Sequence, residues 1–173
     1  MLRDAFISAS VSISDKRREV DELNVYPVPD GDTGTNMSMT IGNTVSELRL
    51  MGDGVPVSHV ADTAASALLR GARGNSGVIL SQILKGICTV VRKCEKEVDV
   101  KTFAKAIESG AKVAYGAVSV PKEGTILTVI RMMSEFTVKY DGFLPNGRDC
   151  ADEIGAFLFA FIVARSIAKH VER

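Results

Sequence analysis

Apolar residues recur every three or four positions along most of this chain, and this spacing limits its fold more than any other feature of the sequence. Met37, Ile41, Val45 and Leu48, for example, fall on one face of a helix with about 3.6 residues per turn. No segment alternates apolar and polar residues in the way that predicts a β-strand. The sequence therefore predicts one all-α domain, an up-and-down array of antiparallel helices. The expected helices cover residues 2–23, 32–50, 56–71, 74–91, 99–118, 126–140 and 149–171. The first is counted as one rod, with Ser14 followed by Asp15 as an alternative place for a new helical turn to begin.

The amino-acid composition argues against two classes of binding partner, nucleic acids and membranes. The chain has 21 Lys and Arg residues against 21 Asp and Glu residues, so its formal net charge is zero, which argues against nucleic-acid binding and against a polybasic membrane patch. The apolar run at residues 154–164 is too short to cross a bilayer, so we expect no membrane span. An odd number of cysteines without metal-site spacing and the lack of a visible signal peptide predict a cytoplasmic protein with buried free thiols.

A short acidic loop between the first two predicted helices is the strongest sign of a binding site. Pro27 and Pro29 stiffen the approach to this loop, because each proline fixes its own φ and holds the preceding residue extended. Asp30 and Asp32 follow two positions apart, with glycines beside them that allow the backbone to fold tightly. Both carboxylates can then face one point, as the ligands of a hard cation do. The sequence predicts a metal site at the start of a helix.

Two familiar motifs do not explain these loops. An EF-hand is excluded because its twelfth position is Ile41 here, where that motif needs a bidentate Glu. The glycine-rich stretch 71–77 is neither a Walker loop nor a dinucleotide fingerprint, since it lacks Gly-Lys-Ser/Thr and follows a helix. Arg73 in this stretch would either contact a phosphate or cap the preceding helix, and the sequence favours neither reading. His59 and His170 are isolated on helices, and we expect neither to be catalytic.

Three glycine-bearing helix starts are expected to lie together. Alternate helices of an up-and-down array begin at the same end, so the helices that start near residues 32, 74 and 124 share one end. Each start offers free backbone N–H groups and the positive end of a helix dipole, and hydroxyl groups add further donors for phosphate oxygens. Asp30 and Asp32 suit a polyphosphate only if Mg²⁺ lies between them and the phosphates. We therefore predict a site for a nucleoside triphosphate with magnesium.

Three stretches resemble, in order and spacing, the N-terminal nucleotide-binding domain of the bacterial fatty acid kinase family, which is similar to the L subunit (the DhaL or Dak2 domain) of dihydroxyacetone kinase. They are LNVYPVPDGDTGTNM at 23–37, GARGNSG at 71–77 and EGTIL at 123–127. The resemblance implies an antiparallel barrel of about eight helices that binds ATP and two Mg²⁺ ions at one end. The sequence Asp-Gly-Asp-Thr-Gly, in place of Asp-x-Asp-His-Gly, favours the fatty acid kinase branch over the dihydroxyacetone kinase branch.

The resemblance also assigns residues. It implies that Asp30 and Asp32 are magnesium ligands and the candidate catalytic residues, and that Asn24 stands where the dihydroxyacetone kinase branch has a third aspartate and is a candidate metal ligand. It also implies that Thr35, Asn36, Ser76, Gly77 and Thr125 contact phosphate. Together with the residues of the three helix starts, the candidate nucleotide-binding residues are Thr33, Gly34, Thr35, Asn36, Gly74, Asn75, Ser76, Gly77, Gly124 and Thr125.

The function that the resemblance implies is transfer of the γ-phosphoryl group of ATP to a fatty acid carboxylate held on a separate fatty-acid-binding protein. Two alternatives stay open, namely the ATP-binding subunit of a dihydroxyacetone (glycerone) kinase and a nucleotide-sensing module without turnover. Because the family continues past the position that matches Arg173, we expect residues 1–173 to be a single domain from a longer protein, without the last helix of the barrel. A homodimer also stays open.

Overall fold

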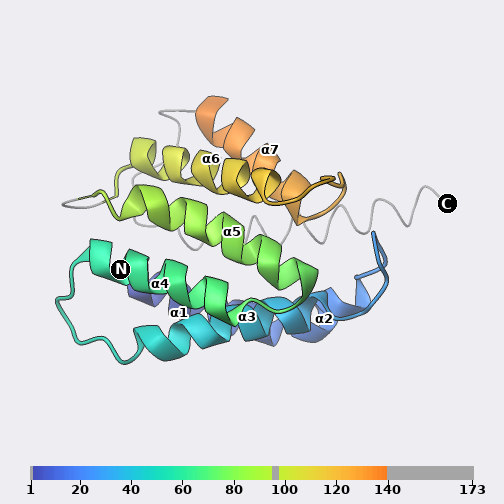
Figure 1. Ribbon diagram of the computed structural model, residues 1–173, viewed down its shortest axis with the longest axis horizontal. Coiled ribbons are helices and arrows are strands. Elements are labelled where there is room, and N and C mark those ends of the chain that lie inside the picture. The colour runs from blue at the N-terminus through green and yellow to red at the C-terminus, as the bar shows by residue number, and fades with distance from the viewer. Residues whose placement is uncertain (1, 95–97, 140–173) are drawn as a thin grey trace.

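The computed structural model describes residues 2–94 and 98–139, and every regular element in those ranges is an α-helix (Figure 1). This confirms the all-α prediction. The predicted helix at 149–171, with Cys150 and His170, lies outside the described residues. The described helices are α1 (Leu2–Asp15), α2 (Arg17–Glu22), α3 (Thr33–Leu48), α4 (Val57–Gly71), α5 (Gly74–Val91), α6 (Val100–Gly116) and α7 (Ile126–Lys139).

The first predicted helix is in fact two helices. The prediction of one rod over 2–23 is wrong, since α1 ends at Asp15 and α2 begins at Arg17, next to the alternative break at Ser14 and Asp15. Lys16 between them has φ −95° and ψ 3°, in the sparsely populated bridge region rather than the helical one. After this break α2 packs against the start of α3, and Val20 of α2 is buried there. The break therefore lies beside the local signal at Ser14 and Asp15, and the packing of α2 on α3 accompanies it.

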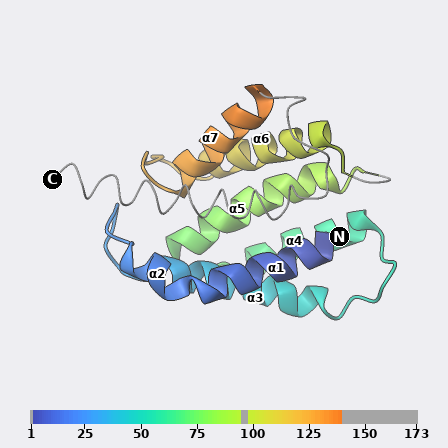
Figure 2. The same cartoon turned by 180° about the vertical axis from the view of Figure 1, so that it is seen from behind.

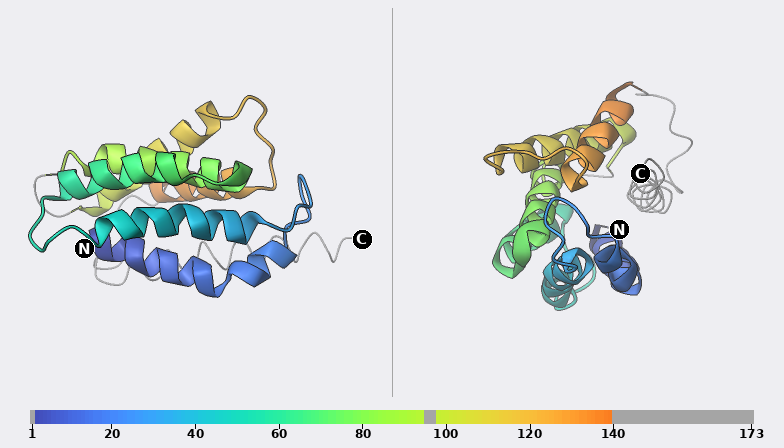
Figure 3. Two further views of the ribbon diagram at one scale, coloured as in Figure 1. Left: turned by 60° about the horizontal axis from the view of Figure 1, so that its bottom comes forward. Right: turned by 90° about the vertical axis from the view of Figure 1, so that its right-hand side faces the viewer.

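The helices from α3 to α7 run up and down, and α5 lies in the middle of the array (Figures 1 and 2). Seen end-on, the described helices form an arc from α1 to α7 (Figure 3). Two hydrophobic clusters hold this arc together, and α5 belongs to both. Its Cys88 joins the cluster formed with α1, α3 and α4, whereas its Ile83 joins the one formed with α6 and α7. By length and composition alone α5 would also be able to cross a membrane, but here it packs between α4 and α6.

Glycines bring α5 and α6 into direct backbone contact. A Cβ atom placed on Gly86 of α5 would lie 2.6 Å from the carbonyl oxygen of Ser109, and one placed on Gly110 of α6 would lie 2.9 Å from the carbonyl oxygen of Ile83. A side chain at either position would therefore force the two helices apart. This close crossing holds the second half of the array, including the start of α7, against α5.

Candidate functional site

The starts of α3, α5 and α7 lie at one end of the array, as the sequence predicts (Figures 1 and 2). The helices between them, α4 and α6, start at the opposite end. Central helix α5 packs against both α3 and α7. Three stretches that are far apart in the sequence, 24–36, 74–77 and 124–125, are thus brought to the same end of the molecule.

Asn24 ties together the two ends of the loop between α2 and α3. Its Nδ2 donates a hydrogen bond to the carbonyl oxygen of Val28 at 2.9 Å. Its Oδ1 accepts hydrogen bonds from the hydroxyl of Thr33 at 2.9 Å and from the backbone amide of Asp32 at 3.3 Å. The amide side chain therefore shapes the acidic loop, and the metal-ligand role of Asn24 stays a prediction.

Asp30 and Asp32 are both exposed, with Gly31 between them at φ 64°. Neither carboxylate makes a hydrogen bond or an ion pair with another described residue. No three His, Cys, Asp or Glu side chains come together as a metal cluster within residues 2–94 and 98–139. Magnesium at nucleotide sites is commonly held by one or two carboxylates, with water and phosphate oxygens completing its shell. Two carboxylates without protein partners fit such an ion, and their role stays a prediction.

Asp21 is a residue of this site that reasoning from the sequence missed. From the last turn of α2 its Oδ1 accepts the backbone amide of Thr35 at 3.0 Å, and its Oδ2 accepts the Thr35 hydroxyl at 2.8 Å. The carboxylate thereby caps the first turn of α3 from another helix. Gly34 makes this approach feasible, because a Cβ atom there would collide with the backbone carbonyl of Arg17 in α2. No local motif signals a cap that comes from 14 residues upstream.

The starts of α3 and α5 are in direct contact. Gly74 has φ 58°, and a Cβ atom there would collide with the side-chain amide of Asn36. A Cβ atom on Gly77 would likewise collide with the hydroxyl of Thr40 and lie 3.3 Å from the carbonyl oxygen of Asn36. The two glycines therefore let the second predicted loop pack onto the first.

Among the described residues, no side-chain cap is found at the first turn of α5. Its N-cap residue is Arg73, which offers no side-chain acceptor, and the first backbone bond of the helix runs from the Gly77 amide to the Arg73 carbonyl at 3.0 Å. The backbone amides of Gly74, Asn75 and Ser76 come before Gly77 in the chain and therefore have no acceptor within the helix. Uncapped amides at the positive end of a helix dipole are the groups that bind phosphate oxygens.

The start of α7 is capped by its own residues. The Thr125 hydroxyl donates to the Lys122 carbonyl at 2.7 Å and accepts the Leu127 amide at 3.3 Å. Gly124, with φ 83°, donates its amide to the hydroxyl of Thr128 at 2.7 Å. These bonds fix the third predicted loop, and they leave Thr125 half-buried.

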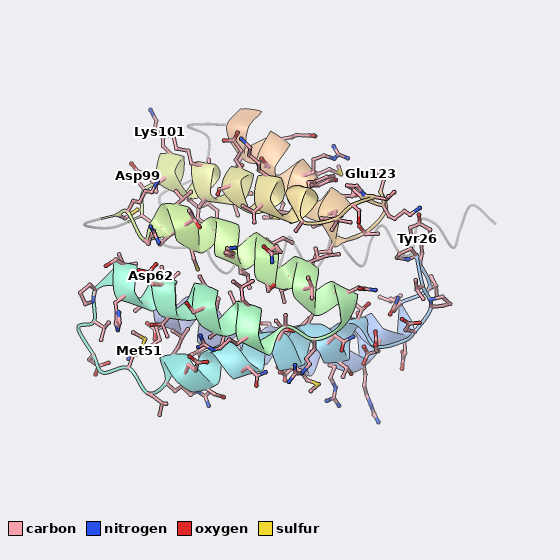
Figure 4. All side chains as sticks on the ribbon, in the orientation of Figure 1. Tyr26, Met51, Asp62, Asp99, Lys101 and Glu123 are labelled. Atoms are coloured by element: carbon pink, nitrogen blue, oxygen red, sulfur yellow. The ribbon has the colours of Figure 1, made fainter. Side chains whose placement is uncertain are left out.

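Glu123 organises the same loop, a role that its place in the sequence motif does not reveal. Its carboxylate accepts hydrogen bonds from the Thr128 hydroxyl at 2.6 Å, from the Arg131 guanidinium at 3.0 Å and from the Tyr115 hydroxyl at 2.8 Å. These three donors lower the pKa of Glu123 to about 2, with the Thr128 bond contributing most. Figure 4 shows Glu123 at the same end of the molecule as Tyr26 of the acidic loop.

The structure shows the surroundings of Arg73 and His59. The Arg73 guanidinium is exposed and donates to the carbonyl oxygen of Ala72, just after α4, at 3.5 Å. That contact is to its neighbour in the chain, so both alternatives for Arg73, phosphate contact and helix cap, stay open. His59 is in the first turn of α4, and this turn lies at the end of the array away from the candidate site (Figure 1).

The two described cysteines are free thiols, as expected, but the prediction that they are buried is correct for Cys88 and wrong for Cys94. Cys88 of α5 is buried in the cluster that α5 shares with α1, α3 and α4, whereas Cys94 is half-buried. Burial, with a smaller contribution from the charge of Asp62, raises the pKa of Cys88 to about 12. A thiol with this pKa is protonated near neutral pH, so Cys88 serves as a core residue.

The sequence matches a known domain family over most of its length. The model of the DAK2 domain family matches residues 27–152. An uncharacterized protein of Staphylococcus epidermidis (strain ATCC 12228 / FDA PCI 1200) is 42% identical over 154 residues, and one of Staphylococcus aureus (strain USA300) is 40% identical over 154 residues. Each alignment covers 88% of this chain and 27% of the relative, so the chain spans about a quarter of the length of these curated relatives.

Proposed function

This chain belongs to the DAK2 domain family, a family of kinase-related nucleotide-binding domains, and from that premise we propose that it binds Mg-ATP at the end of the array where α3, α5 and α7 begin. In this proposal the chain is the nucleotide-binding part of a phosphotransferase, and the acceptor is held by another domain or protein. The chain spans only about a quarter of its relatives, which is consistent with an acceptor site elsewhere.

One observation carries the proposal. The exposed carboxylates of Asp30 and Asp32 have no partner among the described residues, and they stand at the end where the uncapped amides of α5 also lie. Carboxylates repel a bare polyphosphate, while uncapped amides attract it. A ligand that carries both phosphates and a divalent cation satisfies the two groups at once.

The residues divide into two roles under this proposal. Asp30 and Asp32 would hold Mg²⁺, which when bound neutralises charge on the β- and γ-phosphates. The amides of Gly74, Asn75 and Ser76 would take phosphate oxygens, with the hydroxyl of Ser76 as a further donor. The close packing of Gly74 on Asn36 keeps the start of α5 against the first turn of α3, the helix that the acidic loop leads into.

We further propose that the acceptor is a fatty acid carboxylate on a separate fatty-acid-binding protein. A carboxylate is already ionised near neutral pH, so the chain needs no general base to activate it. Dihydroxyacetone is the second candidate acceptor, since the DAK2 domain family belongs with that kinase system. Its hydroxyl group needs a base for deprotonation. His59, the described histidine, lies at the far end of the array, so a base for that reaction would have to come from a partner.

Calorimetric titration tests the proposed site. A non-hydrolysable ATP analogue is titrated into the chain with Mg²⁺ and then with a chelator, for the wild type and for Asp30→Asn and Asp32→Asn. We expect magnesium-dependent binding by the wild type and its loss in both variants. Glu108→Gln, an exposed acid on α6 without a hydrogen bond to another described residue, is the charge-matched control and should bind as the wild type does.

Two results would contradict the proposal. Absence of magnesium-dependent binding by the wild type, and by a version extended to the length of its relatives, would refute the nucleotide site. Unchanged binding by both aspartate variants would refute the metal assignment. To separate the two acceptors, the extended version is assayed for an acyl phosphate and for dihydroxyacetone phosphate with the corresponding acceptor proteins.

A further inference from the structure

One buried hydroxyl group joins the starts of α3 and α5. Thr40 lies on the second turn of α3, and its exposed fraction is 0%. Its Oγ1 accepts the backbone amide of Arg73 at 3.1 Å and donates to the carbonyl oxygen of Asn36 at 2.7 Å. A hydroxyl group has a single proton, so the bond to Asn36 turns a lone pair of Oγ1 toward Arg73.

Both partners of this hydroxyl belong to the candidate phosphate site. Arg73 is the N-cap of α5, and its carbonyl oxygen accepts the first intrahelical bond, from Gly77. Asn36 packs its side-chain amide against Gly74. The Thr40 hydroxyl therefore holds the peptide that leads into α5 at a fixed place relative to the first turn of α3.

We infer that Thr40 is a positioning residue for nucleotide binding, and that its hydroxyl sets the distance between the acidic loop of α3 and the uncapped amides of α5. The inference rests on the proposed function. Thr40 is fully buried, so it acts through Arg73 and Asn36 rather than by contact with a ligand. Without the hydroxyl the Arg73 amide loses its acceptor, and the start of α5 is free to shift to find another.

Thr44 provides a matched control on the same helix. It is also 0% exposed and lies one turn after Thr40. Its hydroxyl donates to the Thr40 carbonyl at 3.4 Å, a bond that stays within α3 and does not reach α5. Replacement of either threonine by valine keeps the shape of the side chain and removes one buried hydroxyl. Only the Thr40 replacement breaks the link between the two helix starts.

The test compares Thr40→Val, Thr40→Ala, Thr40→Ser and Thr44→Val with the wild type. Affinity for a non-hydrolysable ATP analogue with Mg²⁺ is measured by calorimetry. We expect the affinity of Thr40→Val and Thr40→Ala for the nucleotide to fall by about tenfold or more. A loss of this size is usual when a residue that positions a ligand-binding group is removed. Thr40→Ser, which keeps the hydroxyl, and Thr44→Val should bind close to the wild type. Alanine is smaller than threonine and cannot overpack the core, so Thr40→Ala tests the loss of the hydroxyl if Thr40→Val does not fold.

Amide hydrogen exchange gives a readout that does not depend on the ligand. Peptides that cover residues 71–77 should exchange faster in Thr40→Val than in Thr44→Val. Equal binding by the wild type and a folded Thr40→Val or Thr40→Ala would overturn the inference alone, as would equal losses in Thr40→Val and Thr44→Val. If the wild type and its extended version bind no nucleotide, the proposed function fails and the inference fails with it.

Discussion

Replacement by alanine at two glycines of α3, Gly34 and Gly42, is expected to change the stability of the fold in opposite directions. Gly34, in the first turn, packs so closely on α2 that a Cβ atom would collide with the Arg17 carbonyl oxygen and lie 3.0 Å from Cβ of Val20. Gly42, two turns later, has no heavy atom within 4 Å of the place its Cβ would take. Alanine at Gly34 therefore meets fixed backbone, whereas alanine at Gly42 meets open space.

The magnitudes follow from these surroundings. Gly42→Ala should raise the free energy of unfolding by about 0.5–1 kcal/mol, because glycine in a helix interior is disfavoured by that amount relative to alanine. Gly34→Ala should lower it by about 1–3 kcal/mol, the usual cost of overpacking, since a carbonyl of α2 cannot rotate away as a side chain can. The helix-propensity gain at Gly34 is small because this position is in the first turn.

Urea denaturation followed by far-ultraviolet circular dichroism measures both changes in one experiment. The same variants are titrated with the Mg²⁺-bound ATP analogue. Gly34→Ala should weaken binding, because moving α2 also moves Asp21 away from Thr35, and Gly42→Ala should leave binding unchanged. If Gly34→Ala is as stable as Gly42→Ala, the close packing of α2 on the start of α3 is refuted.

Two further predictions concern titratable groups. Because the folded-state pKa of Glu123 is lowered from 4.5 to about 2, its charge stabilises the fold above the higher value and this stabilisation is lost as the pH falls toward the lower one. The wild type should therefore have a higher denaturation midpoint than Glu123→Gln at neutral pH, with a difference that shrinks between about pH 4.5 and pH 2; a constant difference would contradict the assigned hydrogen bonds. Because burial raises the pKa of Cys88 to about 12, iodoacetamide should modify Cys94 first and Cys88 only after denaturation, and equal rates in peptide mass spectrometry would contradict this.

The helices were predictable because the signals that define them are local. The predicted ranges 32–50, 56–71 and 126–140 correspond to α3, α4 and α7, with ends that differ by a few residues. The segment 126–130, which is rich in β-branched residues, forms a helix as part of the predicted range 126–140. The break at Lys16 was not part of the single predicted rod, although Ser14 and Asp15 beside it offer a local signal for a new turn. The packing of α2 on α3 was not predictable, because it is a contact between segments that the local pattern does not report.

The same distinction applies to the candidate site. The three loops were found because glycines and helix starts are visible over a few residues, and the alternation of an up-and-down array then brings them to one end. The residues that support the loops were missed. Asp21 caps α3 across 14 residues, and Thr40 bonds the residue before α5 across 33 residues. An aspartate or a threonine so far from its partner along the sequence matches no motif. These two hydrogen-bonded pairs are therefore recognised only in the folded structure.

The three helix starts differ in how far the chain already satisfies their polar groups, and this difference suggests how they would share a nucleotide. The carboxylate of Asp21 occupies the Thr35 amide at the start of α3, and the start of α7 uses the hydroxyls of Thr125 and Thr128. The start of α5 has no side-chain cap from Arg73. A phosphate binds most strongly where backbone amides have no hydrogen-bond acceptor from the protein. The start of α5 is therefore the place where phosphate binding would be strongest. The acidic loop before α3 is then left for the cation, and a rigid link between α3 and α5 would bring cation and phosphate together.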